Sequence, residues 1–308
     1  MEQFHPLVSI IIPVYNGANF LAQAIDSALS QTYDNIEILV INDGSTDNGA
    51  TEQIALSYGN KVRYFNKRNG GVSSALNLGI EKMQGEYFSW LSHDDLYEPE
   101  KIKKQIEVLQ GLPDHNKTII MCADRLIDVN GKSIFHPYTP FSGYFSGMDM
   151  FKKFYSSHVN INGCSLLIPK SIFLNLGGFK SFKYVQDVEC WTRFMLHNIA
   201  FYCIPDRLSI MRVHQGQVTV RFPELYYSER HDIGRIIVDQ LMADPARYKP
   251  LIKCFLLFCY RRLDSDTASY IETKAHISYP IRRNILTIRG LFEQKLRLIY
   301  QQIIKRAK

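Results

Sequence analysis

The chain has 308 residues, 46% of them hydrophobic and 21% charged, which is long enough for a full buried core and typical of a globular protein. No stretch reaches the roughly 18 apolar residues of a membrane-spanning helix, and the N-terminus is expected to form a first strand rather than a signal peptide. The net charge of +6 arises in residues 215–308, because residues 1–214 carry 19 Lys+Arg against 21 Asp+Glu, so only the C-terminal third is basic.

Strand and helix signals alternate along the first 110 residues. Continuous apolar runs predict strands covered on both faces at residues 8–15, 36–43, 62–65 and 87–91. Helical patterns follow the first three of these strands, at residues 20–31, 51–57 and 72–83. Such alternation is typical of an α/β fold with a Rossmann-like, mostly parallel sheet flanked by helices.

The middle of the chain, residues 118–214, is less regular. A strand signal begins at Thr118 and a turn is expected at Asn130-Gly131, whereas residues 134–155, rich in Phe, Tyr, Gly and Pro, predict a long loop. The aromatic rings of this loop suit local packing, and they also suit the apolar faces of a sugar. Further elements are expected at residues 165–169 (strand), 185–197 (helix) and 208–214 (strand), with mostly helical structure after Gly216.

Three strands of the first half end in polar clusters, at residues 13–17, 42–47 and 92–95. In a parallel sheet these ends lie on one edge and can converge on one ligand. An Asp after the second strand can accept hydrogen bonds from a base or ribose, and the glycine turn before Val72 offers N–H groups to an anion. A turn followed by a helix cap also explains residues 42–47. The first strand is not followed by GxGxxG, which argues against a nicotinamide-dependent oxidoreductase.

The segment YFSWLSHDD, residues 87–95, places two adjacent carboxylates directly after a buried strand. Unpaired buried carboxylates are costly and repel each other, and a hard divalent cation that also binds substrate phosphates relieves both problems. Asp94 and Asp95 therefore predict a site for Mg²⁺ or Mn²⁺ and a diphosphate. The alternative is structural, because Asp95 also suits the N-cap of the helix expected near Pro99.

The order of these motifs resembles the family 2 glycosyltransferases, which have the GT-A fold. The resemblance covers residues 7–215 and rests on PVYN, NDGSTD, NGGVS with Asn77 and Gly79, LSHDD with Pro99, Gly177-Gly178-Phe179, Gln186-Asp187 with Trp191 and Arg193, and Arg212-Val213-His214. It implies a donor-binding half at residues 1–110 and an acceptor-binding half of the same domain at residues 111–215, whereas the helical C-terminal region expected at residues 216–308 lies outside the resemblance.

The resemblance also implies roles for individual residues. Asp187 occupies the place of the catalytic base. The metal ion, Mn²⁺ or Mg²⁺, would be held by Asp94, Asp95 and His214. The acceptor would be bound by Asn162, Gly163, Gln186 and Trp191. The nucleotide of the donor would be bound by Pro13, Val14, Tyr15, Asn16, Asp43, Gly71, Ser73, Asn77, His93 and Asp94.

Three positions depart from the family pattern. Ser92 replaces a common Asp, which leaves the metal site one carboxylate fewer, and Leu76 replaces a common Arg, which removes one phosphate contact. Gln186 replaces the usual Glu before the base, and a neutral neighbour spares Asp187 a like-charge interaction. Without the resemblance, Asp187 fits a plain carboxylate at a helix N-terminus, and His214 fits an ordinary core or surface histidine.

Residues 286–308 combine a Leu/Ile stripe with six Lys and Arg residues. This pattern predicts a basic amphipathic helix that docks on an anionic membrane face. The alternative is that the helix packs on its own domain or on a second subunit, as in a homodimer.

Together these features predict an inverting, metal-dependent glycosyltransferase that uses a nucleotide-sugar, with a UDP-sugar favoured, and a glycan or lipid-linked saccharide acceptor. The setting implied is bacterial surface polysaccharide assembly (LPS O-antigen, LOS or capsule), and no nucleic acid partner is expected. The six cysteines lack CxxC or zinc spacing, which indicates a cytoplasmic protein, at the cytoplasmic face of the inner membrane if the tail binds lipid. The rival is a nucleotide-binding scaffold without transferase activity, which Ser92 favours and the retained Asp and His side chains oppose.

Overall fold

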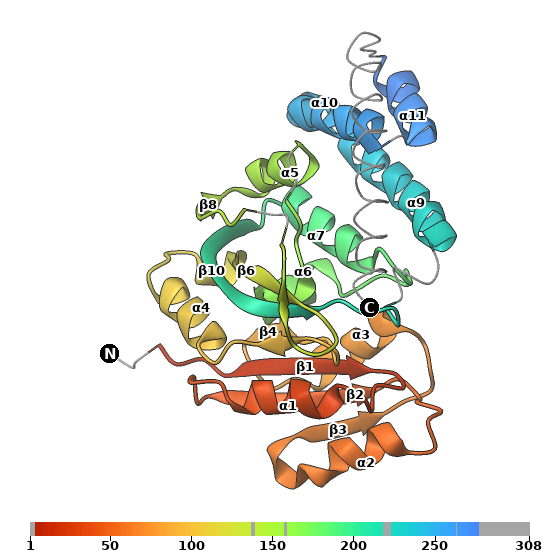
Figure 1. Ribbon diagram of the computed structural model, residues 1–308. Helices are drawn as coiled ribbons and strands as arrows, with labels where there is room; N and C mark the ends of the chain where they lie inside the picture. The colour runs from red at the N-terminus through yellow and green to blue at the C-terminus, as the bar shows by residue number, and fades with distance from the viewer. Residues whose placement is uncertain (1–3, 137–138, 157–158, 218–222, 263, 277–308) are drawn as a thin grey trace. The chain divides into compact units, whose positions relative to one another are not determined.

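The computed structural model describes residues 4–136, 139–156, 159–217, 223–262 and 264–276 (Figure 1). The chain divides into two compact units. Unit 1 comprises Met1–Met150 and Asn160–Pro223, and unit 2 comprises Phe151–Val159 and Glu224–Lys308. Every residue singled out above for binding or catalysis lies in unit 1.

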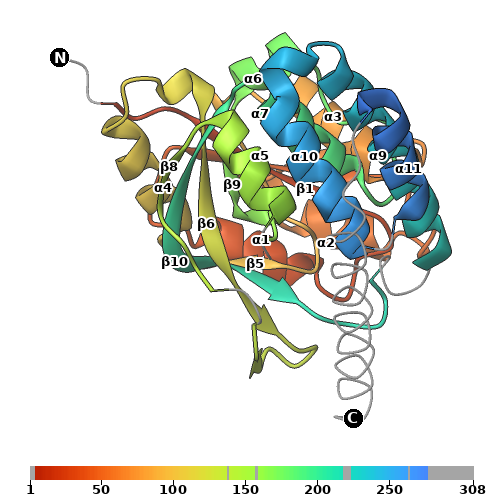
Figure 2. The same ribbon diagram turned by 90° about the horizontal axis from the view of Figure 1, so that it is seen from above.

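Unit 1 is built on a sheet whose first four strands are parallel, as the sequence predicts. Their order across the sheet is β3 (Arg63–Asn66), β2 (Ile36–Asn42), β1 (Val8–Val14) and β4 (Tyr87–Trp90). All seven residues of β1 are buried, because this strand has a neighbour on each side and a helix layer on each face. The layers are α1 (Leu21–Leu29) and α2 (Ala50–Ser57) on one face and α3 (Val72–Lys82) on the other (Figure 2).

The sheet continues into strands of mixed direction. β9 (Leu166–Pro169) pairs antiparallel with β4 and with β6 (Thr118–Ile127), and β6 pairs in parallel with β10 (Ala200–Arg212). β10 curves along β6 (Figures 1 and 2), and its last part pairs with β5 (Leu96–Tyr97). The curved strand therefore brings the end of β10 to the loop that follows β4.

The remaining elements of unit 1 are helices, short strands and 3₁₀ turns. They are the helices α4 (Lys101–Gln110), α6 (Lys170–Leu176) and α7 (Gln186–Leu196), the short strands β7 (Ser133–Ile134) and β8 (Gly143–Phe145), and the 3₁₀ turns η1 (Gly59–Lys61), η2 (His115–Lys117) and η3 (Gly163–Ser165). The predicted α/β fold class is confirmed: the central sheet is curled, mixed in its second half, and flanked by helices.

Two sequence predictions in the middle of the chain are wrong. The long loop expected at residues 134–155 contains β8 and the helix α5 (Gly147–Ser156), whose Met150, Phe151 and Tyr155 are buried. The frequent Gly and Pro residues before it conceal this helical pattern. The strand expected at residues 208–214 begins already at Ala200, because β10 accommodates the turn-forming pair Pro205-Asp206 through a register irregularity between Ile204 and Arg207.

The described part of unit 2 is helical, as the sequence predicts for residues after Gly216. It contains α9 (Pro223–Met242), α10 (Pro245–Arg262) and α11 (Ser265–Ala275). An aromatic cluster forms its core, in which the ring of Phe255 lies 4.9 Å from that of Tyr155 and 6.3 Å from that of Phe151. None of the helices in the described residues has an apolar stretch of the length that crossing a bilayer requires.

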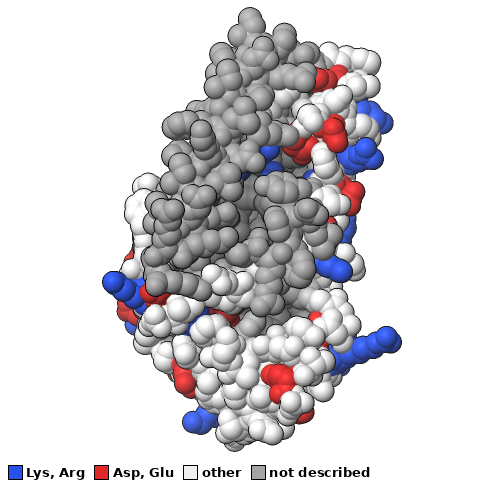
Figure 3. Space-filling view, turned by 45° about the vertical axis from the view of Figure 1, so that its right-hand side comes forward, with Lys and Arg blue, Asp and Glu red and all other residues white. Residues whose placement is uncertain are grey.

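The charge of the C-terminal third lies mostly outside the described residues. Residues 277–308 hold eight Lys and Arg against one Glu, and the predicted amphipathic helix at residues 286–308 falls within them. On the face shown in Figure 3, Lys and Arg side chains of the described residues are interspersed with Asp and Glu side chains among uncharged residues. The basic character of the C-terminal third is therefore a property of the sequence that this structure does not place.

Candidate active site at the carboxyl ends of the parallel strands

The loops that follow β1 and β2 are joined by hydrogen bonds. The N–H of Asn16 donates to Oγ of Ser45 (2.9 Å), and the N–H of Thr46 donates to Oδ1 of Asn16 (2.7 Å). Asn16 has φ 50°, in the left-handed region that Asn tolerates better than most residues. Beside it the residue Tyr15 is 45% exposed, whereas Pro13 and Val14 are buried in the strand. Two of the three polar clusters therefore meet at one edge, where Tyr15 is accessible to solvent.

Asp43 is buried at this edge and accepts hydrogen bonds from three groups. The donors are the N–H of Gly70 (3.0 Å), the N–H of Gly71 (2.7 Å) and Nζ of Lys67 (2.6 Å). The anion that the glycine turn binds in this structure is therefore the Asp43 carboxylate, and not an external ligand as the sequence suggests. The contact fixes Asp43 against the start of α3, where helix N–H groups favour negative charge.

Asp94 pairs with His214 in the loop after β4. Oδ2 of Asp94 lies 2.9 Å from Nε2 of His214, and the two side chains are 14% and 15% exposed. Burial by itself would raise the pKa of Asp94, but the hydrogen bond from His214 and the nearby His93 together hold this pKa below its usual value. Burial lowers the pKa of His93 against the attraction of Asp94. Asp94 is therefore the ionised carboxylate of the pair of aspartates.

Asp95 is buried, and its hydrogen-bond partners and the direction of its pKa shift differ from those of Asp94. Its Oδ1 accepts a hydrogen bond from the N–H of Arg212 (2.9 Å) and its Oδ2 one from Sγ of Cys164 (3.4 Å). Burial and the charge of Asp94 raise the pKa of Asp95 well above its usual value. The expectation that Asp95 ligates the metal does not fit this geometry. It is not a helix cap either, because α4 begins at Lys101.

The donor set at the Asp94–His214 pair suits a hard divalent cation that is shared with a substrate. Within the part of the chain that the structure describes, no three His, Cys, Asp or Glu side chains come together in an arrangement that could hold a metal ion. Mg²⁺ characteristically uses one or two protein ligands and completes its shell with water and phosphate oxygens. The Asp94 carboxylate fits such a site, whereas both ring nitrogens of His214 are engaged in this structure, Nε2 with Oδ2 of Asp94 and Nδ1 with the N–H of Gly216 (3.1 Å).

Asp187 lies in the first turn of α7. Its Oδ1 accepts a hydrogen bond from the N–H of Val188 (2.7 Å), and burial raises its pKa to about 6. A carboxylate with a raised pKa is a better proton acceptor near neutral pH. The preceding Gln186 is buried, and its Oε1 has no hydrogen-bond partner among the residues the structure describes.

The predicted acceptor residues have different surroundings. Asn162 is partly exposed, accepts a hydrogen bond from the N–H of Cys164 (3.0 Å) and donates one to Asp124 (3.3 Å). Gly163 lies under the Trp90 ring, where a Cβ atom would be 2.3 Å from a ring carbon. Trp191 is fully buried, with its ring 5.7 Å from that of Phe179. Trp191 is therefore a packing residue that does not face an acceptor in this structure.

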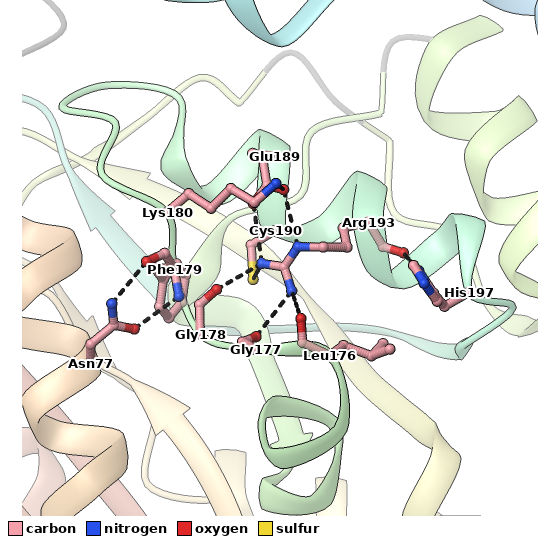
Figure 4. Close-up of polar contacts among 10 residues, drawn as sticks. All are labelled: Asn77, Leu176, Gly177, Gly178, Phe179, Lys180, Glu189, Cys190, Arg193 and His197. Carbon is pink, nitrogen blue, oxygen red and sulfur yellow. Dashed lines mark hydrogen bonds and ion pairs between the residues drawn. The ribbon is translucent and has the colours of Figure 1, made fainter. Parts of the chain in front are cut away.

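Ser73 and Asn77, predicted to bind the nucleotide, connect α3 to the segment before α7. Nδ2 of Asn77 donates to the carbonyl oxygen of Phe179 (2.8 Å), and the N–H of Phe179 donates back to Oδ1 (2.8 Å), as Figure 4 shows. Oγ of Ser73 donates to the carbonyl oxygen of Phe182 (3.0 Å). Both side chains thus hold the donor half and the acceptor half together.

We expect Gly178→Ala to break this connection. A Cβ atom at Gly178 would lie 2.3 Å from Oδ1 of Asn77, so the segment must move and the two hydrogen bonds to Phe179 weaken. The variant should lose about 1–3 kcal/mol of unfolding free energy, measured by urea denaturation. Gly111→Ala is the matched control, because its Cβ would meet nothing closer than 3.5 Å and it should be nearly neutral. Equal stability of both variants would contradict the expectation.

Two residues at the site were missed by the sequence reading. Lys67 directly follows β3, so the rule that strand ends carry the site could have identified it. Cys164 lies behind the Ser92–Asp95 turn, and its Sγ accepts a hydrogen bond from the N–H of Ser92 (3.3 Å). Nothing in the sequence marks a cysteine of η3 for this position, because the two segments are far apart along the chain.

Comparisons with known proteins agree with this architecture. Residues 9–173 match the family described as Glycosyl transferase family 2. The chain therefore belongs to the family 2 glycosyltransferases, and the resemblance noted in the sequence is confirmed. An uncharacterized glycosyltransferase of Rickettsia typhi is 51% identical over 217 residues, which cover 70% of this chain and 67% of the relative.

More distant proteins share parts of the chain or its fold. The chondroitin synthase of Pasteurella multocida is 38% identical over 135 residues, which cover 43% of this chain and 14% of that protein. The crystal structure of S. aureus TarS in complex with UDP-GlcNAc superposes with a TM-score of 0.67 at 18% identity, over 84% of this chain and 73% of that one. An uncharacterized glycosyltransferase of Rickettsia bellii matches over only 31% of its length, so this chain corresponds to one part of that larger relative.

Proposed function

We propose that this protein transfers a sugar from a UDP-sugar to a hydroxyl group of a glycan or lipid-linked saccharide, with inversion at the anomeric carbon. What most supports this function is the arrangement of the hydrogen-bonded pair Asp94 and His214 at the carboxyl ends of parallel strands and one carboxylate of raised pKa at the start of α7. The TarS structures with UDP and UDP-GlcNAc support the choice of donor. The chondroitin synthase relative supports a role in bacterial surface polysaccharide assembly.

The proposed reaction assigns the donor to the edge formed by β1, β2 and β4. The exposed ring of Tyr15 offers a stacking surface for the base, and buried Asp43 offers a carboxylate oxygen to the N–H of a uracil. Asp94 and His214 would hold Mg²⁺ or Mn²⁺ beside the diphosphate. Such an ion, when bound, supplies positive charge that stabilises the departing UDP.

Asp187 is the proposed general base. It takes the proton of the acceptor hydroxyl as the acceptor oxygen bonds to the anomeric carbon, while the bond between that carbon and the UDP oxygen breaks. Asn162 and Gln186 remain proposed acceptor residues, the latter because its buried Oε1 is unpaired in the described structure. A single displacement of this kind inverts the anomeric configuration.

Release of UDP from a panel of UDP-sugars tests the proposal. We expect wild-type protein to release UDP from at least one donor, faster when an oligosaccharide acceptor is added. A protein that binds UDP and releases none from any donor would instead be the nucleotide-binding scaffold. Ser92 favours that rival because it leaves the site one carboxylate fewer, whereas the retained Asp94, Asp95, Asp187 and His214 side chains oppose it.

The basic segment at residues 286–308 is proposed to attach the protein peripherally to an anionic membrane surface. Residues 277–308 carry most of the excess positive charge, and each Lys or Arg near such a surface contributes about 1 kcal/mol, less at high salt. Deleting residues 286–308 should reduce sedimentation with phosphatidylglycerol vesicles and leave UDP release unchanged. A changed oligomeric state or lower melting temperature, with no salt-dependent vesicle binding in wild type, would favour the packing alternative.

A further inference from the structure

Arg193 is buried in unit 1 with every donor of its guanidinium group engaged (Figure 4). The side chain is 7% exposed. Nε and Nη2 donate to the two carboxylate oxygens of Glu189, at 3.0 and 3.1 Å. Nη2 also donates to the carbonyl oxygen of Gly178 (2.7 Å), and Nη1 donates to those of Leu176 and Gly177, the latter at 3.0 Å. The five N–H hydrogens thus have five oxygen partners.

The three carbonyl groups belong to the end of α6 and the residues after it. The last carbonyls of a helix lack partners within the helix, and a cation there is favourable. Gly177 has φ 84°, so the chain turns sharply at this point and directs consecutive carbonyls toward Arg193. Arg193 therefore fixes the course of the backbone across three residues, which a single hydrogen bond could not do.

The same segment is held from the opposite side by Asn77. Residue 179 follows directly on the three residues that Arg193 binds, and both of its backbone groups bind the Asn77 side chain. Asn77 lies on α3, and Asp43 accepts hydrogen bonds from the N–H groups of Gly70 and Gly71 directly before this helix. These hydrogen bonds, joined by α3 and by the backbone of residues 176–179, thus connect the edge proposed for the nucleotide to α7, the helix whose first turn contains Asp187.

The buried ion pair needs an explanation other than stability. Glu189 is 2% exposed, and its Oε1 also lies 2.9 Å from Nζ of Lys180. Removing such charges from water costs several kcal/mol, and well-packed apolar side chains are often at least as stabilising. A pair with fixed bidentate geometry is better suited to defining a position.

We propose that Arg193, held by Glu189, is a positioning residue that sets the distance between Asp187 and the donor site by fixing residues 176–179 between α7 and α3. This inference rests on the proposed function of Asp187 as the base. Arg193 does not touch substrate, since it is enclosed by its protein partners. Lys cannot replace it, because an ammonium group has three donors and no planar fork.

The test compares Arg193→Lys with wild type and with Arg247→Lys, the same substitution at an exposed arginine of α10. We expect Arg193→Lys to keep its affinity for UDP in calorimetry and to lose about 10- to 100-fold in kcat for UDP release from the best UDP-sugar of the panel, with little change in KM. The acidic limb of its pH profile should move to lower pH, since a displaced Asp187 is better hydrated. Arg247→Lys should match wild type in all three.

Hydrogen exchange supplies a readout that does not depend on activity. Amides of residues 177–188 should exchange faster in Arg193→Lys, whereas those of β1 and β2 should not. Unchanged kcat and exchange, or equal losses of UDP affinity and kcat, would overturn the positioning role. If wild type releases no UDP, the proposed function fails, and unchanged exchange at residues 177–188 would separately overturn the positioning role.

Lys180→Met serves if Arg193→Lys does not fold. It removes only the partly exposed partner of Glu189, so the core remains intact. Faster exchange at residues 177–188 together with a lower kcat would support the positioning role, and wild-type values of both would overturn it.

Discussion

Asp187→Asn should reduce turnover by about 10²–10⁴-fold while leaving UDP affinity nearly unchanged, because the amide keeps the shape of the side chain and cannot take a proton. The proposed donor residues Tyr15, Asp43 and Asp94 lie in the segments after β1, β2 and β4, so their geometry does not depend on the charge at residue 187. Single-turnover kinetics measures the loss and calorimetry measures UDP binding. Loss of UDP binding with intact turnover would contradict the assignment of Asp187 as the base.

The pH dependence of wild type follows from the raised pKa of Asp187. The base works only when deprotonated, so kcat should rise about tenfold per pH unit below a pKa of about 6 and level off above it. In Asp187→Asn this limb should disappear from the residual rate. A wild-type profile that stays flat from pH 5 to pH 8 would show that Asp187 does not limit the reaction.

Asp187→Asn should raise the stability of the folded protein at neutral pH although it lowers the activity. The folded protein binds the Asp187 proton more tightly than the unfolded chain does, so this group lowers stability as pH rises from about 4 to about 6. Above pH 6 the full penalty is present, and Asp187→Asn removes it. The variant should therefore melt at a higher temperature than wild type at pH 7.5, with the difference vanishing near pH 4. Active-site groups commonly trade stability for function in this way.

The first half of the fold could be predicted because its parallel strands are buried on both faces. Strands of this kind appear in the sequence as continuous apolar runs. The strands at β1, β2 and β4 and the polar clusters after them need no long-range information. By contrast, the start of β10 could not be predicted, because the pair Pro205-Asp206 is typical of a turn. The strand tolerates this pair through an irregular register with β6, which the sequence pattern does not reveal.

The position of the candidate site could be predicted from the sequence, but the different surroundings of Asp94 and Asp95 could not. Asp94 and Asp95 are adjacent, and which one pairs with His214 depends on residues more than a hundred positions later, namely Arg212 at the end of β10 and His214 just after it. Asn77 similarly matches a nucleotide-binding pattern, yet its partner is Phe179. Family patterns give the position of such residues, whereas their partners come from tertiary structure.

Asp94→Asn and Asp95→Asn should therefore differ sharply, although the two substitutions are adjacent and chemically identical. Asp94→Asn removes the ionised oxygen beside His214, so binding of Mn²⁺ in the presence of UDP should weaken at least as much as the 10- to 100-fold typical of losing even an indirect metal partner. Asp95→Asn keeps an amide oxygen for the N–H of Arg212 at a position where burial already disfavours the charge, so Mn²⁺ affinity should stay near that of wild type.

Titration of Mn²⁺ by electron paramagnetic resonance, with UDP present, measures both affinities directly. EDTA should abolish UDP release by wild type, and added Mn²⁺ or Mg²⁺ should restore it. His214→Gln should behave like Asp94→Asn, because it removes the other ligand of the proposed pair while the hydrogen bonds from Arg212 to Asp94 and Asp95 remain. If Asp95→Asn lost as much Mn²⁺ affinity as Asp94→Asn, the inward carboxylate must turn to meet the ion, and the division of roles between the two aspartates would be wrong. Full activity in EDTA would remove the metal from the proposed reaction altogether, leaving the Asp94–His214 pair to act on the diphosphate through its own charge and hydrogen bonds.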